Sequence, residues 1–282
     1  MRNSVRTHII KQFTTDDRKK DYMASISALV IARNESANIA ECIRSMQDIA
    51  DEIIVLDGGS KDDTVNIAES LGARVVHHHE WEGYGKQRQK LQKYATKNWC
   101  VWLDADERLT PELREEIKAF TEKAKTNEIL NISRANHAFG IRIRHCGYFP
   151  DRVLRVHSRT YTTYNDSLVH EKLVLPADAK IVDSKNSMLH YTYDTYLNMQ
   201  MKQVKYASEW AKNKYTKKGR GCCFLTPFIK GGFSFLRKYI FQLGILDGRI
   251  GFLISASTSS YTFNKYLCLY QIAMEKKHES GK

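Results

Sequence analysis

Four short apolar segments alternate with helical patterns over the first part of this chain, and this alternation limits the possible folds more than any other feature. The apolar segments span residues 26–32, 52–56, 74–78 and 99–103. Each has the length of a strand, and the stretches between them have helical spacing and helix-capping residues. Strands of this kind are typical of a parallel sheet that helices cover on both faces. The sequence therefore predicts an α/β domain.

Acidic residues follow three of these segments, namely Glu35, Asp57 and Asp104. Right-handed crossovers place the carboxyl ends of parallel strands along one edge of the sheet, so we expect these side chains to lie close together. Asp106 lies two positions beyond Asp104, and in an extended backbone both would point to the same side. Paired carboxylates suit Mg²⁺ or Mn²⁺ together with substrate phosphates, whereas the alternative is that this Asp-x-Asp is only a polar turn. Because clustered carboxylates repel one another, three acidic strand ends favour a site for a metal and a sugar nucleotide.

The composition narrows the class of protein. The formal net charge is +12, which predicts attraction to an anionic partner such as nucleic acid, lipid head groups or a phosphorylated substrate. None of the six cysteines lies in a Cys-x-x-Cys pair, so neither a zinc ribbon nor a disulfide framework is expected. Residues 1–24 are expected to form a basic tail or a short helix rather than a signal peptide. No uninterrupted apolar run reaches ~18 residues, so a transmembrane helix is not expected.

Three separate motifs resemble those of family 2 glycosyltransferases. They occupy residues 30–35 (VIARNE), 54–64 (IVLDGGSKDDT) and 103–107 (LDADE). The resemblance implies the GT-A fold, a Rossmann-like mixed sheet, with a nucleotide-sugar donor and an inverting mechanism. It also implies that Asp57 contacts the uracil of a UDP-sugar, that Asp104 lies near the ribose, and that Asp106 holds Mg²⁺ or Mn²⁺ on the diphosphate. Many members carry two aspartates where this chain has Asp57-Gly58. The chain therefore departs from the family pattern at the contact with the uracil.

The second half of the chain is similar to one branch of that family. The matching segments are residues 148–156 (YFPDRVLRV), 168–171 (LVHE) and 189–191 (LHY). That branch adds a hexose to the inner core of bacterial lipopolysaccharide, as a β-1,4-glucosyltransferase does, and its Val-His-Glu motif supplies the catalytic carboxylate. The resemblance implies Glu171 as the catalytic base, a UDP-hexose donor with glucose expected, and a lipid-linked acceptor in the heptose region of the core. Glu171 also suits this role because inverting transfer needs a base that is separate from the metal pair.

Other charged residues are candidates for binding the sugar nucleotide. Together with Asp57 and Asp104 they are Arg33, Glu35, Lys86 and Arg155. Lys86 stands near a helix start, where a phosphate is favoured, and Arg155 could hold a donor or acceptor phosphate; the alternative for both is a surface charge. Residues 77–79 are three consecutive histidines, which cannot all converge on one ion because neighbours on a strand alternate between faces. A structural or solvated role is expected for them.

A change of composition near residue 194 divides the sequence. The expected parts are an N-terminal tail over 1–24, a GT-A catalytic domain over 25–193 and a helical, partly amphipathic extension over 194–282. Residues 199–240 carry ten Lys or Arg and one acidic residue, and residues 224–246 are rich in aromatic and aliphatic side chains. Basic residues beside aromatics suit a helix at a membrane interface. We therefore expect a cytoplasmic protein that binds peripherally to the anionic inner face of the cytoplasmic membrane; the alternative is packing on the catalytic domain or on a second subunit.

Three other functions are compatible with parts of the sequence. The chain could act on another cell-surface polysaccharide, it could be a nucleotidyltransferase, or it could be a non-catalytic protein that binds an anionic polymer. A nucleotidyltransferase would need a glycine-rich nucleotide loop, and Gly58-Gly59-Ser60 is too short for one. A nucleic-acid-binding protein would show a groove-reading helix or an aromatic platform, whereas the aromatics gather in the C-terminal region. No nucleic-acid partner is expected, and the donor sugar, the linkage and the oligomeric state stay open.

Overall fold

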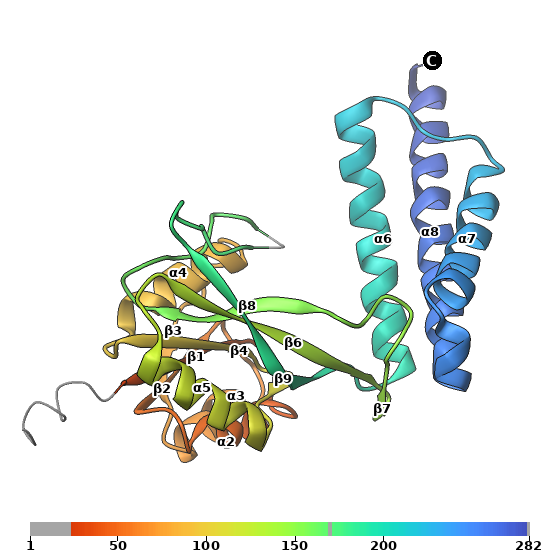
Figure 1. The fold of residues 1–282 in the computed structure, drawn as a ribbon. Coiled ribbons are helices and arrows are strands. Elements are labelled where there is room, and N and C mark those ends of the chain that lie inside the picture. Colours follow the sequence, from red (N-terminus) through yellow and green to blue (C-terminus); the bar gives the residue numbers. More distant parts are fainter. Residues whose placement is uncertain (1–23, 169–170, 281–282) are drawn as a thin grey trace, which may run out of the picture.

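The computed structural model describes residues 24–168 and 171–280 and shows a sheet domain beside a bundle of helices (Figure 1). Residues 1–23 of the expected tail lie outside the described residues, as do Val169 and His170 of the Val-His-Glu motif. The sheet domain holds the four apolar segments, and the bundle holds the basic and aromatic C-terminal region.

The first half of the sheet is parallel. Its strands are β1 (Ile26–Ala32), β2 (Glu52–Asp57), β3 (Arg74–His77) and β4 (Trp99–Asp104), in the order β3-β2-β1-β4. The connecting helices are α2 (Ile39–Met46), α3 (Thr64–Ser70) and α4 (Tyr84–Tyr94). This is the alternation of strand and helix that the sequence predicts.

The second half makes the sheet mixed. β8 (Arg152–Ser158) pairs antiparallel with β4, β6 (Glu128–Ala138) pairs antiparallel with β8, and β9 (Lys180–Tyr193) pairs parallel with β6. Two short strands, β5 (Glu107–Arg108) and β7 (Ile141–Arg142), pair antiparallel with β9 and β6. Within the described residues the sheet therefore has nine strands, and the Rossmann-like mixed sheet of the resemblance is confirmed.

Alternating side chains of the central strands build a core on each face of the sheet. One face packs against α2, α3 and α5 (Pro111–Lys123), and the other packs Trp102 against Leu91 of α4. Helix α5 starts soon after the acidic pair because Thr110 Oγ1 accepts a hydrogen bond from Leu113 N at 3.3 Å and Pro111 supplies the first helical residue. Burial on both faces holds β4 in place and so fixes the position of the carboxylates at its end.

The C-terminal bundle stands beside the sheet domain (Figure 1). Its elements are α6 (Tyr196–Lys218), α7 (Thr226–Leu236), the π-helical turn η1 (Arg237–Phe241), the 3-10 turn η2 (Gly244–Asp247) and α8 (Gly248–Ser280). Met199, Ile250 and Ile254 of the bundle share an apolar cluster with β6 and the segment that follows β7. Asp247 Oδ2 accepts hydrogen bonds from the main-chain N–H groups of residues 144 and 145, at 3.1 and 2.7 Å. These contacts anchor the bundle to the far end of the sheet.

Much of the apolar surface of the bundle is exposed. The turn region between α7 and α8, residues 237–247, is called the elbow below. It carries five apolar side chains with exposed fractions from 50% to 73%: Ile240, Phe241, Leu243, Ile245 and Leu246. Among the described helices, none is by itself long and apolar enough to span a bilayer, but the bent pair Thr226–Phe241 and Gly244–Glu279, at 70° to each other, meets that requirement jointly.

Candidate active site

Asp104, the last residue of β4, lies between two buried arginines. Arg88 Nη2 of α4 donates a hydrogen bond to Oδ1 at 2.6 Å, and Arg155 Nη2 of β8 donates to Oδ2 at 2.5 Å. Burial alone would raise the pKa of Asp104, but the charges of Arg155 and Arg88 hold it well below its usual range. The carboxylate is therefore ionised and fixed in one orientation, at the edge where the parallel strands end.

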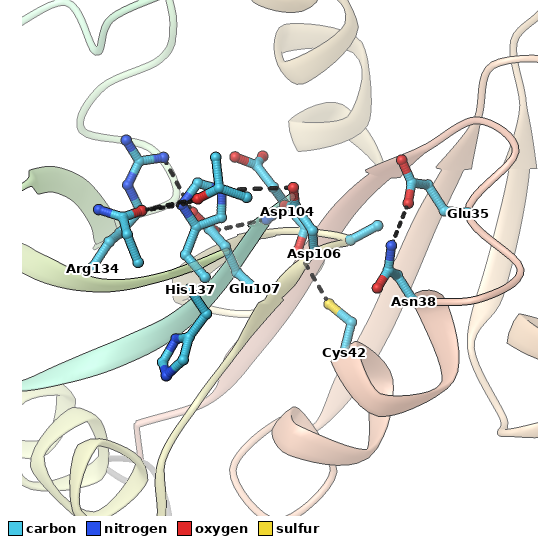
Figure 2. A network of polar contacts seen from close by, with 12 residues as sticks. Glu35, Asn38, Cys42, Asp104, Asp106, Glu107, Arg134 and His137 are labelled. Carbon is cyan, nitrogen blue, oxygen red and sulfur yellow. Dashed lines mark hydrogen bonds and ion pairs between the residues drawn. The ribbon is translucent and has the colours of Figure 1, made fainter. Parts of the chain in front are cut away.

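Basic and acidic side chains alternate outward from Asp104, and Figure 2 labels Glu107 and Arg134 among them. Together with Arg88 and Asp104 they form the arginine network, whose other members are Arg155, Glu107, Arg134 and Asp151. Arg155 Nη2 also donates to Glu107 Oε1 at 2.7 Å, and Arg134 Nη1 lies 3.5 Å from the same oxygen. Arg134 forms a forked pair with Asp151 at 2.9 and 3.0 Å. Burial raises the pKa of Glu107, Arg155 opposes this shift and Asp104 adds to it. Arg155 is buried within the network, so its alternative role as a surface charge is wrong.

Glu171 lies in the irregular segment between β8 and β9, and Arg88 ties it to the same site. Arg88 Nε donates to Glu171 Oε1 at 2.8 Å. The Arg88 guanidinium is buried over the rings of Trp102 and Tyr164, at 5.2 and 4.9 Å from their centroids. One planar, forked guanidinium therefore holds Asp104 and Glu171 at once. Two carboxylates that are far apart in the sequence meet at one point of the structure.

Asp106 and His190 face each other next to this network. Asp106 lies in the turn after β4, and the pairing of β5 with β9 sets Glu107 opposite His190. His190 Nε2 lies 3.6 Å from Asp106 Oδ2, and His190 Nδ1 lies 2.6 Å from Asn136 Oδ1. Because the Asn136 amide nitrogen donates to the Tyr148 carbonyl at 2.7 Å, the Asn136 oxygen is the acceptor for His190 Nδ1–H. Nε2 is then the ring nitrogen that faces Asp106.

This pair fits a divalent cation. Asp106 and His190 are both partly exposed, as ligands of an exchangeable ion must be. The hydrogen bond to Asn136 fixes the tautomer and the orientation of the imidazole, as outer-shell partners of metal ligands do. Carboxylate and imidazole ligands suit Mn²⁺, and Mg²⁺ commonly takes one or two carboxylates with substrate phosphates. His190 would thus add a ligand that the acidic motif alone does not contain.

Glu35 lies on the α2 side of Asp106 (Figure 2). Its Oε2 accepts a hydrogen bond from Asn38 Nδ2 at 3.0 Å. Burial raises the pKa of Glu35, the Asn38 hydrogen bond lowers it, and the charge of Asp106 raises it again. From α2, the Cys42 thiol donates to the main-chain oxygen of Asp104 at 3.4 Å. Helix α2 and the end of β4 are therefore joined on this side of the site.

Asp57 ends β2 and forms a separate part of the site. Its buried carboxylate accepts hydrogen bonds at 3.1 Å from two main-chain N–H groups of the turn that follows. His77 Nδ1 lies 3.6 Å from Asp57 Oδ2, and the ligand atoms of Asp57, His77 and His79 lie within 4.8 Å of one another. His78 instead lies 3.7 Å from Glu82. The alternation along the strand therefore holds, but two of the three histidines gather at Asp57.

Arg33 and Lys86 lie at the rim of the site. Arg33 is exposed after β1 and packs beside Gly58, 3.5 Å from the place that a Cβ would take, so it stays next to Asp57. Lys86 lies in the first turn of α4, and its Nζ is 3.6 Å from Glu82 Oε1. The structure does not bring either residue into the arginine network.

The model of the family "Glycosyl transferase family 2" matches residues 27–244, which include every site residue named above and all of the sheet except Ile26. The chain belongs to glycosyl transferase family 2. This family 2 chain is 31% identical over 252 residues to an uncharacterized glycosyltransferase of Rickettsia felis, covering 83% of this chain and 86% of the relative. It is 29% identical over 260 residues to the lipopolysaccharide core biosynthesis glycosyltransferase LpsC of Rhizobium meliloti, covering 87% and 92%.

Solved structures match a smaller part of this family 2 glycosyltransferase. Mannosyl-3-phosphoglycerate synthase from Rubrobacter xylanophilus is 21% identical with a TM-score of 0.37, over 43% of each chain. Glucosyl-3-phosphoglycerate synthase from Mycobacterium tuberculosis, solved with Mn²⁺, UDP and glucosyl-3-phosphoglycerate, is 24% identical with a TM-score of 0.36, over 46% of this chain and 51% of that one. The match thus spans about half the length of these two proteins.

Sequence reasoning assigns no binding or catalytic role to three residues of the family 2 site: Arg88, Arg134 and His190. Arg88 lies on the buried face of α4, three residues before Leu91, and a charge on an apolar face is a signal for a buried ion pair. His190 lies in the LHY segment, but a lone histidine in a strand is more often structural. Arg134 lies in a strand whose pairing partners are distant in the sequence, so nothing nearby distinguishes it.

Proposed function

We propose that this family 2 enzyme transfers a hexose, with glucose favoured, from a UDP-sugar to the heptose region of the lipopolysaccharide inner core, with inversion of the anomeric centre. The observation that carries the proposal is the Arg88 bridge, because it holds Glu171 beside Asp104. In this proposal Glu171 is the base that deprotonates the acceptor hydroxyl, and Asp104 binds the UDP-sugar donor. The LpsC relative, whose name refers to lipopolysaccharide core biosynthesis, supports this class of acceptor.

The donor lies along the carboxyl ends of the parallel strands in this proposal. Asp57 takes the uracil end, Asp104 takes the ribose, and Asp106 with His190 would hold Mg²⁺ or Mn²⁺ at the diphosphate. A bound divalent cation would stabilise the charge of the leaving diphosphate. Without a cation the carboxylates would repel a diphosphate, so the acidic site itself argues for one.

The basic candidates divide into two groups. Arg155 donates hydrogen bonds to Asp104 and to Glu107. It therefore positions Asp104, which binds the UDP-sugar in this proposal, rather than binding a phosphate itself. Arg33 and Lys86 lie at the rim, where their charges can meet the donor from outside. Glu35 borders the cation side through its charge interaction with Asp106.

Glu171 takes the acceptor proton in the proposed reaction. Arg88 holds Oε1, and within the described residues no side chain or main-chain group donates a hydrogen bond to Oε2. The acceptor hydroxyl oxygen attacks the anomeric carbon from the face opposite the diphosphate, and its proton passes to Glu171. The bond from carbon to the diphosphate oxygen breaks, and its electron pair leaves with UDP. An α-linked donor therefore gives a β-linked product.

The test measures UDP release from a panel of UDP-hexoses, with Mn²⁺ or with excess EDTA, and with a heptose-containing core oligosaccharide as the acceptor. We expect the highest rate with UDP-glucose, only when both metal and oligosaccharide are present, and a β-linkage by NMR. Full activity in EDTA would contradict the cation site. Transfer to another bacterial polysaccharide but not to the heptose oligosaccharide would contradict the acceptor and leave the family activity intact.

We further propose that the enzyme works in the cytoplasm, bound peripherally to the inner face of the cytoplasmic membrane. The exposed apolar side chains of the elbow support this location. Lys230, Arg237 and Arg249 are exposed in and around the elbow and would face anionic head groups. A lipid-linked acceptor would be available at that surface.

A further inference from the structure

Trp81 and Tyr84 form an exposed aromatic pair at the start of α4. Their side chains are 46% and 43% exposed, and their rings lie 4.7 Å apart at an interplanar angle of 88°. Neither ring takes part in the network around Asp104 or in the group around Asp57. Large aromatic side chains that gather at a protein surface commonly mark a binding site, because they combine an apolar face with a polar edge.

Two glycines dock this pair onto the segment that leads to Glu171. Gly83 has a φ of +100°, and a Cβ there would stand 2.6 Å from Leu168 Cα. A Cβ at Gly85 would stand 1.9 Å from the carbonyl oxygen of Asn165. Because these side chains are absent, Tyr84 N can donate to the Leu168 carbonyl at 3.1 Å. The main chain of residues 165–168 is therefore packed directly on the turn that carries the two rings.

Tyr84 lies on the same face of α4 as Arg88, the residue that holds the proposed base. Tyr84 and Arg88 are four residues apart on α4 and so share a helix face. Arg88 Nε binds Glu171 Oε1 at 2.8 Å, which places Glu171 on that same face. Burial raises the pKa of Tyr84, and its charge interactions with Tyr206, Asp104 and Glu171 raise it further, as expected for a phenol close to these groups.

We propose that Trp81 and Tyr84 form a subsite for a pyranose ring of the acceptor, next to the sugar hydroxyl that Glu171 deprotonates. This subsite presupposes the proposed glycosyl transfer and adds its acceptor side. A pyranose has a face of C–H groups and a rim of hydroxyls, and two rings at a right angle offer an apolar surface for the face and a phenol for the rim. Glu82 lies between the two aromatic residues in the sequence and can bind a further hydroxyl, whereas an apolar peptide would leave its charge without water.

Tyr94 provides a matched control on the same helix. It is 42% exposed, close to the value for Tyr84. It is the last residue of α4, at the opposite end of the helix from Tyr84. Its ring lies 5.5 Å from the guanidinium of Arg74. Replacing Tyr94 removes a similar exposed aromatic side chain without touching the proposed subsite.

The experiment measures transfer to the heptose core oligosaccharide by Trp81→Ala, Tyr84→Ala and Tyr94→Ala, together with each protein's melting temperature and its affinity for UDP with Mn²⁺. For the first two variants we expect the acceptor KM to rise ~10-fold, with kcat within ~3-fold of wild type, because the lost contact is made equally in the ground state and the transition state. UDP affinity should not change. Trp81→Phe should recover most of the acceptor affinity, and Tyr94→Ala should match wild type.

The outcomes separate the subsite from the reaction. If Trp81→Ala and Tyr84→Ala keep the acceptor KM of Tyr94→Ala, or lose UDP affinity instead, the subsite is wrong while the glycosyl transfer stands. If the wild-type enzyme transfers no hexose to the oligosaccharide, the proposed acceptor is wrong and the subsite with it. Should an alanine variant unfold, Trp81→Leu and Tyr84→Leu keep apolar volume without an aromatic face, and the same KM increase is expected.

Discussion

Glu171 is the residue on which the proposed chemistry depends most directly. Glu171→Gln keeps the shape of the side chain and an oxygen that can accept from Arg88 Nε, but it removes the basic carboxylate. General-base catalysis contributes typically ~10²–10⁴-fold, so kcat should fall by about that factor. UDP affinity should stay near wild type because, in the proposed site, Asp57 and Asp106 bind the donor away from Glu171. Steady-state kinetics and UDP calorimetry with Mn²⁺ measure the two quantities.

Glu116→Gln is a suitable control for this substitution. Glu116 accepts hydrogen bonds from the main chain of residues 185 and 186, at 2.8 and 3.0 Å, away from the arginine network. This variant should keep its kcat. Near-normal turnover in a folded Glu171→Gln enzyme would contradict the base role and would leave Asp151 and Asp166 as the next candidates.

His157 links the stability of the sheet domain to pH. It is fully buried, its Nε2 accepts from Trp102 Nε1 at 3.0 Å, and its Nδ1 lies 2.9 Å from the Ser158 carbonyl oxygen. Burial lowers the pKa of His157 from 6.5 to about 4. The unfolded chain therefore takes up the proton near pH 6.5 and the folded protein only near pH 4. Stability is present above this window and is lost as the pH falls through it, by about 2 kcal/mol between pH 7 and pH 5.

Urea unfolding at pH 7 and pH 5 measures this effect. In His157→Gln the free energy of unfolding should differ less between the two pH values than in wild type, because the titrating group is gone. His278→Gln removes an exposed histidine from the last turn of α8 and should keep the wild-type difference. An equal pH dependence in all three proteins would show that His157 is not the group responsible.

The motif carboxylates could be predicted from the sequence, whereas their counter-charges could not. Asp57 and Asp104 each end an apolar strand, so their place at one sheet edge follows from local pattern and right-handed crossovers. Arg88 belongs to a helix with many basic and polar residues, and which of them is buried depends on the face that packs against the sheet. His190 meets Asp106 only because β5 pairs with β9, a contact between distant segments.

At the element scale, the pairing of β5 with β9 brings together the two side chains of the proposed cation site. Asp106→Ala should lose nearly all activity, and His190→Gln should raise the Mn²⁺ concentration for half-maximal activity by at least ~10-fold. The reason is the facing pair of Asp106 Oδ2 and His190 Nε2, with the imidazole fixed by Asn136. Activity against Mn²⁺ concentration and the EPR signal of free Mn²⁺ measure the change in two independent ways.

His137→Gln is the control for the cation site. His137 lies on β6, and its Nδ1 is 2.8 Å from the main-chain oxygen of Ala135 rather than near Asp106. Its Mn²⁺ dependence should equal that of wild type. Unchanged Mn²⁺ binding in His190→Gln would contradict this site and would direct attention to Asp57, His77 and His79, whose ligand atoms also lie close together.

The two halves of the sheet were not equally predictable. β1 to β4 alternate with helices, so periodicity along the chain was sufficient to find them. β6 and β9 pair in parallel across a long separation, and their register shifts twice, between Asn131 and Ser133 and between His137 and Ala138. Such irregularities break the simple alternation of buried and exposed side chains, so these strands could be expected only through the resemblance to a family.

At the scale of the whole molecule, the sheet domain and the bundle differ in how much of their apolar surface is buried. The sheet domain buries it on both faces of the sheet, whereas the bundle leaves much of it exposed at the elbow. The sequence showed that this region is basic and aromatic, but not that its apolar side chains would gather at one turn. A net charge of +12 adds a long-range attraction to anionic surfaces.

This combination predicts binding to anionic membranes through the elbow. The protein should sediment with vesicles that contain phosphatidylglycerol, and less so as salt rises, because each nearby Lys or Arg contributes ~1 kcal/mol that is screened over ~8 Å at physiological ionic strength. The double variant Phe241→Asp/Leu246→Asp should bind more than ~10-fold more weakly, since it removes two side chains worth roughly 1.5–3 kcal/mol each on burial. Leu175→Asp changes a 45% exposed leucine of the sheet domain and should bind normally. Wild-type protein that ignores these vesicles at low salt would show that the elbow packs against another protein surface instead.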